Sequence, residues 1–84
     1  MRPKIVRTYS GKYEVKYDIA ECYRYWLKEG KAPPECCYCM LHNGHVAIVN
    51  TEEEAKRLVS LLPECPGLPA MINIGVYLKQ IESV

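Results

Sequence analysis

The stretch CCYCMLHNGHVAIVN, residues 36–50, decides the fold expected of this chain. Its centre, Asn43-Gly44, is the strongest short signal for a two-residue hairpin turn, because both positions of such a turn need a positive φ. The flanking segments Cys36–His42 and His45–Asn50 are then predicted to be paired strands. The face of this hairpin predicted to be buried carries Cys37, Cys39, Leu41, Val46 and Ile48.

Another hairpin is predicted over residues 4–17, with its turn at Ser10-Gly11. In that register Val6 pairs with Val15, and the period of two separates a buried face from a wet one. The predicted buried face holds Val6, Thr8, Tyr13, Val15 and Tyr17, and the other holds Ile5, Arg7, Tyr9, Lys12, Glu14 and Lys16.

Two helices are predicted from their capping residues. Asp18 with Glu21 begins one helix that stops at Gly30, and Thr51 with Glu54 begins the other. The apolar stripes at helical spacing are Ile19, Cys22, Tyr23 and Trp26 in the first and Ala55, Leu58, Val59 and Leu62 in the second. A last strand is predicted from the alternation of Ile72, Ile74, Val76 and Leu78.

These elements predict a single α+β domain, residues 1–84, in the order ββαββα-β. The simplest packing is a mostly antiparallel sheet with both helices on one face and the opposite face open. Glycine and capping residues recur at an offset of 33 residues, for example Gly11 with Gly44 and Glu21 with Glu54. These matches suggest either a duplication into two ββα half-repeats, 4–30 and 36–63, or the same arrangement of elements used twice without a duplication.

Composition narrows the class of protein. With 49% hydrophobic residues and a net charge of +1, the chain is neither a disordered tail nor a protein that coats nucleic acid by charge alone. Neither a membrane span nor a signal peptide is evident, so an intracellular, cytoplasmic location is expected. A domain of 84 residues buries only about 60% of the surface of its unfolded chain, so a staple or a second copy would help to stabilise it.

Seven Tyr and no Phe, with few Asn and Gln, give the chain an unusual composition. This composition resembles that of small proteins of hyperthermophilic archaea or their viruses, a resemblance that covers no motif and transfers no residue roles. Hyperthermophile proteins tend to contain few Asn and Gln and many Glu and Lys. Disulfides occur inside the cells of such organisms.

The five cysteines favour disulfide stapling over metal binding in the predicted hairpin. Along a strand, Cys36 and His42 lie about 20 Å apart, too far to share one ion. His42 with His45 would need a third ligand, so neither a metal site nor a cofactor is predicted. Disulfides worth about 3 kcal/mol each are predicted among Cys22, Cys37, Cys39 and Cys65.

The open sheet face is the predicted binding surface. Tyrosines on a sheet can stack bases while Lys and Arg follow phosphates. Residues 1–16 hold five basic residues and one acidic, a net charge of +4 that supports a single-stranded nucleic-acid ligand. The residues predicted to bind it are Arg7, Tyr9, Lys12, Lys16, Tyr38, His42, His45, Tyr77 and Lys79.

A homodimer formed through the same face is an alternative with equal weight. The predicted interface is the apolar set Tyr38, Met40, Ala47, Val49 and Met71. No phosphate-binding loop, hydrolase elbow or zincin helix is present, so an enzyme with a small-molecule substrate is not expected. The function predicted is a non-enzymatic binding module for nucleic acid, with an interaction protein and a small zinc-binding domain as alternatives.

Overall fold

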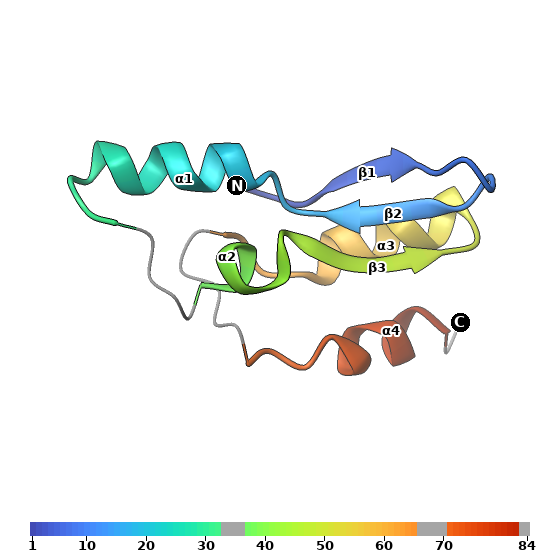
Figure 1. The fold of residues 1–84 in the computed structure, drawn as a ribbon. Coiled ribbons are helices and arrows are strands. Elements are labelled where there is room, and N and C mark those ends of the chain that lie inside the picture. Colours follow the sequence, from blue (N-terminus) through green and yellow to red (C-terminus); the bar gives the residue numbers. More distant parts are fainter. Residues whose placement is uncertain (33–36, 66–70, 83–84) are drawn as a thin grey trace.

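The computed structural model describes residues 1–32, 37–65 and 71–82. These residues form a three-stranded antiparallel sheet in the order β1-β2-β3, together with helices, which confirms the α+β class. Figure 1 shows the elements, which in chain order are β1 (Lys4–Arg7), β2 (Tyr13–Lys16), α1 (Ile19–Lys28), α2 (Tyr38–His42), β3 (His45–Val49), α3 (Glu52–Leu61) and α4 (Ile74–Glu82).

The first hairpin is present, but its register differs from the prediction by one residue. Ile5 pairs with Val15, where the two-residue turn would have paired Val6 with it. The reason lies in the loop: the Thr8 amide donates to the Lys12 carbonyl at 2.9 Å, so three residues form the turn. The last of the three, Gly11, has a φ of 81°, as in a type I turn closed by a left-handed residue.

A register shift of one residue moves side chains to the opposite face. Val15 is fully buried and Ile5 is half-buried on its face, whereas Val6 is 44% exposed on the other. The predicted burial of Val6 is therefore wrong, and that of Val15 and Tyr17 is confirmed.

The stretch that decided the expected fold does not form a hairpin. Residues 38–42 are the short helix α2, and Asn43 with a φ of 57° and Gly44 with a φ of 76° end that helix. A hairpin turn and a left-handed helix end both require positive φ values, so the motif Asn43-Gly44 is compatible with either structure. The second half thus contributes one strand where the repeat hypothesis expected two.

Strand β3 follows Gly44 and pairs with β2, with a bulge between Val15 and Lys16. The Tyr17 amide extends this pairing by donating to the Gly44 carbonyl at 2.8 Å. Val46, Ala47 and Val49 of β3 are buried, so this strand supplies much of the core on the side that α3 covers.

Helix α3 begins where its capping box predicts. The Thr51 hydroxyl accepts from the Glu54 amide at 3.1 Å, and Ala55, Leu58 and Leu62 are buried against the sheet. The last segment corrects the prediction of a strand. It forms α4, which packs on α3 through a stripe at helical spacing: Ile74, Tyr77, Leu78 and Ile81.

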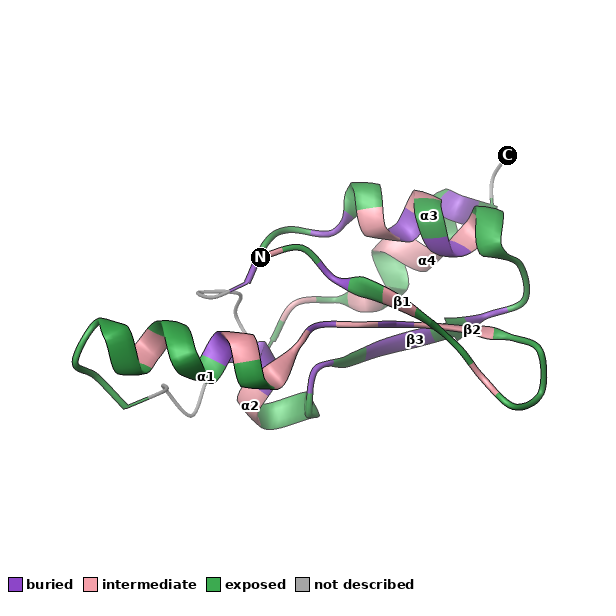
Figure 2. Ribbon diagram, turned by 90° about the horizontal axis from the view of Figure 1, so that it is seen from above, coloured by how far each residue is buried: buried purple, intermediate pink, exposed green. Residues whose placement is uncertain are grey.

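Helix α1 begins at the predicted cap, since an Asp18 carboxylate oxygen accepts from the Glu21 amide at 3.2 Å. It does not lie beside α3 on the sheet. It extends beyond the end of the sheet, where it packs on α2 (Figure 1). Figure 2 shows that most of α1 is exposed, and Cys22 is its one buried residue.

Gly44 lies where no side chain fits. A Cβ there would come within 2.3 Å of the Tyr17 carbonyl oxygen, whereas a Cβ at Gly11, whose φ is also positive, would meet nothing within 4 Å. We expect Gly44→Ala to lower the free energy of unfolding by about 3 kcal/mol and Gly11→Ala by about 1 kcal/mol. Urea denaturation measures both, and equal losses would contradict the close approach at Gly44.

Candidate metal centre

Four cysteine side chains meet at one point where three parts of the chain come together. Cys22 comes from α1, Cys37 and Cys39 from the beginning of α2, and Cys65 from the segment after α3. The exposed fraction is 0% for Cys22, Cys39 and Cys65 and 2% for Cys37. All four are therefore inside the hydrophobic core.

Their sulfur atoms are close enough to share one ligand. The Cys39 and Cys65 sulfurs are 3.0 Å apart, and the Cys22 sulfur is 3.6 Å from that of Cys65. The Cys37 sulfur lies 3.9 Å from that of Cys22 and 4.0 Å from that of Cys65. The sulfurs of Cys22, Cys39 and Cys65 all lie within 4.8 Å of one another.

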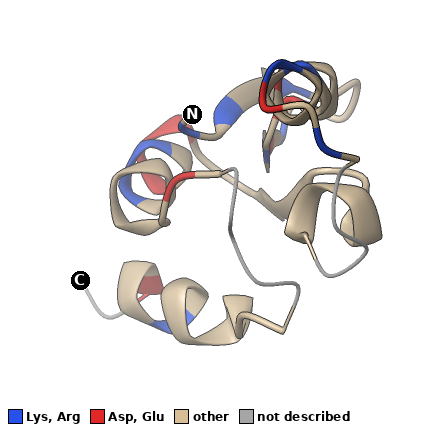
Figure 3. Ribbon diagram, turned by 90° about the vertical axis from the view of Figure 1, so that its left-hand side faces the viewer, with Lys and Arg blue, Asp and Glu red and all other residues tan. Residues whose placement is uncertain are grey.

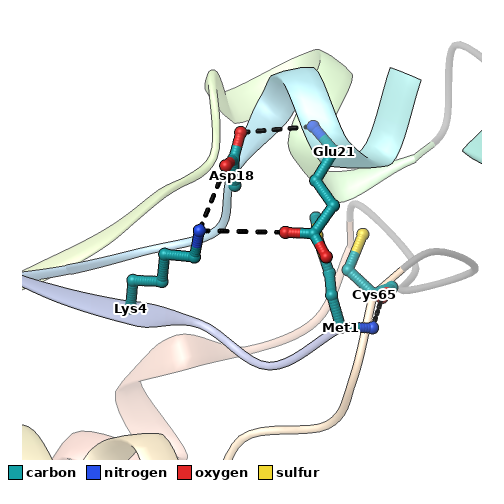
Figure 4. Close-up of polar contacts among 5 residues, drawn as sticks. All are labelled: Met1, Lys4, Asp18, Glu21 and Cys65. Carbon is teal, nitrogen blue, oxygen red and sulfur yellow. Dashed lines mark hydrogen bonds and ion pairs between the residues drawn. The ribbon is translucent and has the colours of Figure 1, made fainter. Parts of the chain in front are cut away.

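Backbone contacts fix each ligand-bearing segment. Cys37 is the N-terminal cap of α2, and its carbonyl accepts from the Met40 and Leu41 amides at 3.1 Å. The Cys39 carbonyl accepts from the Gly44 amide at 3.1 Å, so the end of α2 also holds this cysteine. Figure 4 shows Cys65 beside Met1: the Cys65 amide donates to the Met1 carbonyl, and the Met1 nitrogen donates to the Cys65 carbonyl.

Tyr17, directly after β2, lies next to the cysteine cluster. Its ring is fully buried and packs edge-on against Tyr38, with the ring centroids 6.0 Å apart. Its hydroxyl donates to the Pro63 carbonyl at 2.5 Å, two residues before Cys65. This bond connects the end of β2 to the segment that carries Cys65.

Most of the sulfur separations are close to those around a single tetrahedral ion. Zinc bound to four cysteines has Zn–S distances of about 2.3 Å, which place the sulfurs about 3.8 Å apart in a tetrahedron. Four of the six sulfur–sulfur separations, at 3.0–4.0 Å, bracket that value. The mutually close group is Cys22, Cys39 and Cys65, and Cys37 approaches it through Cys22 and Cys65. Four buried sulfurs also leave no open position for a substrate, which is typical of a structural site.

Other uses of four thiols fit less well. A disulfide needs a sulfur–sulfur distance of about 2.05 Å between two partners and gives no reason for four sulfurs to converge. An iron–sulfur cluster spreads its thiolates over several irons. Sulfurs from three segments that lie this close, with Cys22, Cys39 and Cys65 all within 4.8 Å of one another, favour one ion.

The core disfavours negative charge on these thiols. Burial first, and the neighbouring Cys65 thiol next, raise the pKa of Cys22 from 9.0 to about 12. The pKa of Cys39 is raised by its hydrogen bond with Cys65 and by burial. The pKa of Tyr17 is raised by burial and by the neighbouring Cys65. A bound cation is the usual means of holding thiolates in such surroundings.

The four disulfide candidates of the sequence are therefore the four residues that lie close together. The argument against a metal site assumed a strand over residues 36–42, whereas residues 38–42 form helix α2. A strand over 36–42 would have put Cys39 and the histidines at fixed intervals along an extended chain, whereas α2 turns Cys37 and Cys39 toward Cys22. Cys36, the fifth cysteine, lies outside the described residues.

The two histidines are not part of the sulfur cluster. The His45 Nδ1 lies 2.6 Å from a carboxylate oxygen of Glu14, at the surface of the sheet. The His42 ring lies against the Tyr38 ring, with centroids 4.6 Å apart. His42 and His45 therefore make other contacts than a shared metal ion.

The residues predicted to bind nucleic acid do not share one sheet face. Arg7, Tyr9 and Lys12 are exposed at the end of the first hairpin, and Lys16 lies on β2. Tyr38 is 3% exposed and its hydroxyl donates to the His45 carbonyl at 2.7 Å, so it cannot stack a base. Tyr77 and Lys79 lie on α4.

The apolar patch predicted for a dimer is also not present as such. Tyr38, Ala47 and Val49 are buried within the chain, Met40 is half-buried in α2, and only Met71 is strongly exposed. Tyr38, Ala47 and Val49 face the core because α2 and β3 pack against the rest of the fold. The homodimer stays a prediction, and this set of residues does not supply its interface.

No family model, curated protein or solved structure matches this chain. Within residues 1–32, 37–65 and 71–82, no helix has the length and apolar character needed to cross a membrane.

Single Cys→Ser variants test the ligand set. We expect one zinc per chain in the wild-type protein and in Cys36→Ser, and a loss of most of the zinc in Cys22→Ser, Cys37→Ser, Cys39→Ser and Cys65→Ser, because each removes one of four sulfurs. Elemental analysis of protein purified under reducing conditions measures this. Zinc kept by Cys37→Ser but lost by Cys36→Ser would show that the ligand set is wrong.

The sign of the pH dependence separates the metal-bound from the metal-free protein. With zinc, the native sulfurs are thiolates while unfolded thiols take up protons below pH 9, so the free energy of unfolding should rise toward pH 9. Without zinc, native Cys22 keeps its proton up to about pH 12, so stability should fall from pH 9 to 12. Urea denaturation across these ranges measures both slopes; identical slopes would contradict thiolate ligation.

Proposed function

We propose that this chain is a small, non-enzymatic binding module whose fold depends on one structural Zn²⁺ held by Cys22, Cys37, Cys39 and Cys65. The observation that carries the proposal is the close approach of four buried sulfurs from three segments, with four of their six separations at 3.0–4.0 Å. On binding, the four thiols lose their protons to solvent and bond to the ion as thiolates.

A structural role for the ion follows from what the cysteines connect. Helix α1 has Cys22 as its single buried residue, so the rest of its surface gives it little attachment to the core. The Cys65 segment is joined to Met1 and, through Pro63, to Tyr17. An ion at the centre of the four sulfurs would bond α1, α2 and this segment together.

A role in catalysis is disfavoured by the same geometry. Catalytic zinc keeps one position for water or substrate, and its ligands usually include His or a carboxylate. Here the candidate ligands are four buried cysteines, with no His or carboxylate among them. A binding module held together by its metal is therefore the function that the arrangement supports best.

Removal of the metal tests this proposal. Protein as purified should carry one zinc per chain by native mass spectrometry, and a chelator should lower the midpoint of thermal unfolding by about 20 °C or more, because structural zinc contributes folding energy directly. Added Zn²⁺ should restore the midpoint and Mg²⁺ should not, since Mg²⁺ prefers oxygen ligands.

A protein that carries no metal, and whose mass is lower than that of the reduced chain by two or four hydrogens, would contradict the proposal in favour of disulfides. Iron in place of zinc would keep the site but overturn the identity of the ion.

A further inference from the structure

Basic residues and exposed tyrosines gather in the same part of the chain. Residues 1–32 hold eight of the eleven Lys and Arg. They also hold the three exposed tyrosines: Tyr9, which is fully exposed, Tyr23 at 47% and Tyr25 at 44%. The other four tyrosines are buried or half-buried. Most cations and all the exposed tyrosines thus belong to the first 32 residues, which form the first hairpin and α1.

This region is continuous in space. Strand β1 is an edge strand of the sheet, and α1 extends the same side of the molecule beyond the sheet (Figures 1 and 2). We call this side the basic edge and define it by its two ends: Arg7, Tyr9 and Lys12 on the hairpin, and Arg24, Tyr25 and Lys28 on α1. The molecule measures 42 Å along its longest axis.

The cations at the two ends are not neutralised by the fold. In the middle, Lys4 forms ion pairs with Asp18 at 3.2 Å and Glu21 at 3.8 Å (Figure 4). Among residues 1–32, 37–65 and 71–82, no acidic side chain forms an ion pair with Arg7, Lys12, Arg24 or Lys28. The charges of these four side chains are therefore available to a binding partner.

Helix α1 offers a place where a planar ring can lie. A shallow hollow on it is lined by Glu21, Arg24, Tyr25, Leu27 and Lys28, and Arg24 and Lys28 are one turn apart. Figure 3, seen from the end where α1 lies, shows Lys and Arg on this helix and near the N-terminus. Residues 1–32 also hold four of the ten acidic residues, so this part of the chain has a net charge of +4. Glu52, Glu53 and Glu54 lie at the beginning of α3.

We propose that the basic edge binds single-stranded nucleic acid, with Arg7, Lys12, Arg24 and Lys28 contacting phosphates and Tyr9 and Tyr25 stacking bases. Nucleic acid is favoured over an acidic polypeptide because it combines regular negative charge with planar bases, which exposed tyrosines recognise without regard to sequence. The inference rests on the proposed function, since zinc bound to Cys22 would set the position of α1 relative to the hairpin.

Fluorescence anisotropy with a labelled oligo(dT) of about 16 nucleotides tests the basic edge, with zinc measured on each preparation. Arg24→Ala with Lys28→Ala should lower the slope of log affinity against log salt by about 1.4, since each lost phosphate contact on a single strand is worth about 0.7. The control, Lys56→Ala with Lys79→Ala, removes the same charge from α3 and α4 and should leave the slope unchanged.

Stacking is tested by a second pair of variants. Tyr9→Ala should weaken binding roughly fivefold or more, and Tyr9→Phe should bind like the wild type, because the ring supplies the stacking. Protein treated with a chelator should bind no more tightly than the Arg24→Ala, Lys28→Ala variant, because α1 is then no longer held in place at the end of the sheet.

The failures of the two proposals are distinguishable. Zinc-loaded protein that does not bind oligo(dT) at low salt, or that binds only an acidic peptide or prefers duplex DNA, overturns the nucleic-acid proposal and leaves the metal site intact. Equal losses in the α1 variant and its control overturn the basic edge. A protein without zinc that binds as predicted overturns the metal proposal alone.

Discussion

The convergence of four sulfurs on one point is the constraint on which the rest of the structure depends. Cys22, Cys37, Cys39 and Cys65 are the only cysteines among the described residues, and all four are in the core. Helix α1 would otherwise be joined to the fold by half-buried side chains such as Ile19 and Trp26. The proposed metal bond to Cys22 would therefore hold α1 to the rest of the domain.

The arrangement of sulfurs depends in turn on the end of α2. Gly44 passes so close to the Tyr17 carbonyl that a side chain is excluded, and this approach holds α2 against the end of β2. Tyr17 continues the connection through its hydroxyl bond to Pro63. The sheet, α2 and the Cys65 segment thus position the ligands before any ion is bound, which lowers the entropy lost on binding.

Local chemistry made part of the fold predictable. The caps at Asp18 and Thr51 are recognisable because a side-chain oxygen followed three residues later by Glu satisfies backbone amides, and both helices begin there. The motif Asn43-Gly44 was read as a hairpin because a helix end requires the same positive φ values. The pattern over residues 71–79 predicts a strand because Ile72, Ile74, Val76 and Leu78 alternate with a period of two. The apolar residues Ile74, Leu78 and Ile81 also satisfy a helical stripe, and the segment forms α4. The four cysteines were grouped correctly as neighbours, but their shared centre follows from tertiary packing, which spacing along the chain does not encode.

X-ray absorption spectroscopy at the zinc edge tests the central claim most directly, because it reports the identity, number and distance of the atoms bound to the ion. The account predicts one shell of four sulfurs at about 2.3 Å. A shell containing nitrogen or oxygen would contradict the assignment of the four cysteines. Protein purified under reducing conditions that gives no zinc signal would contradict the metal centre itself.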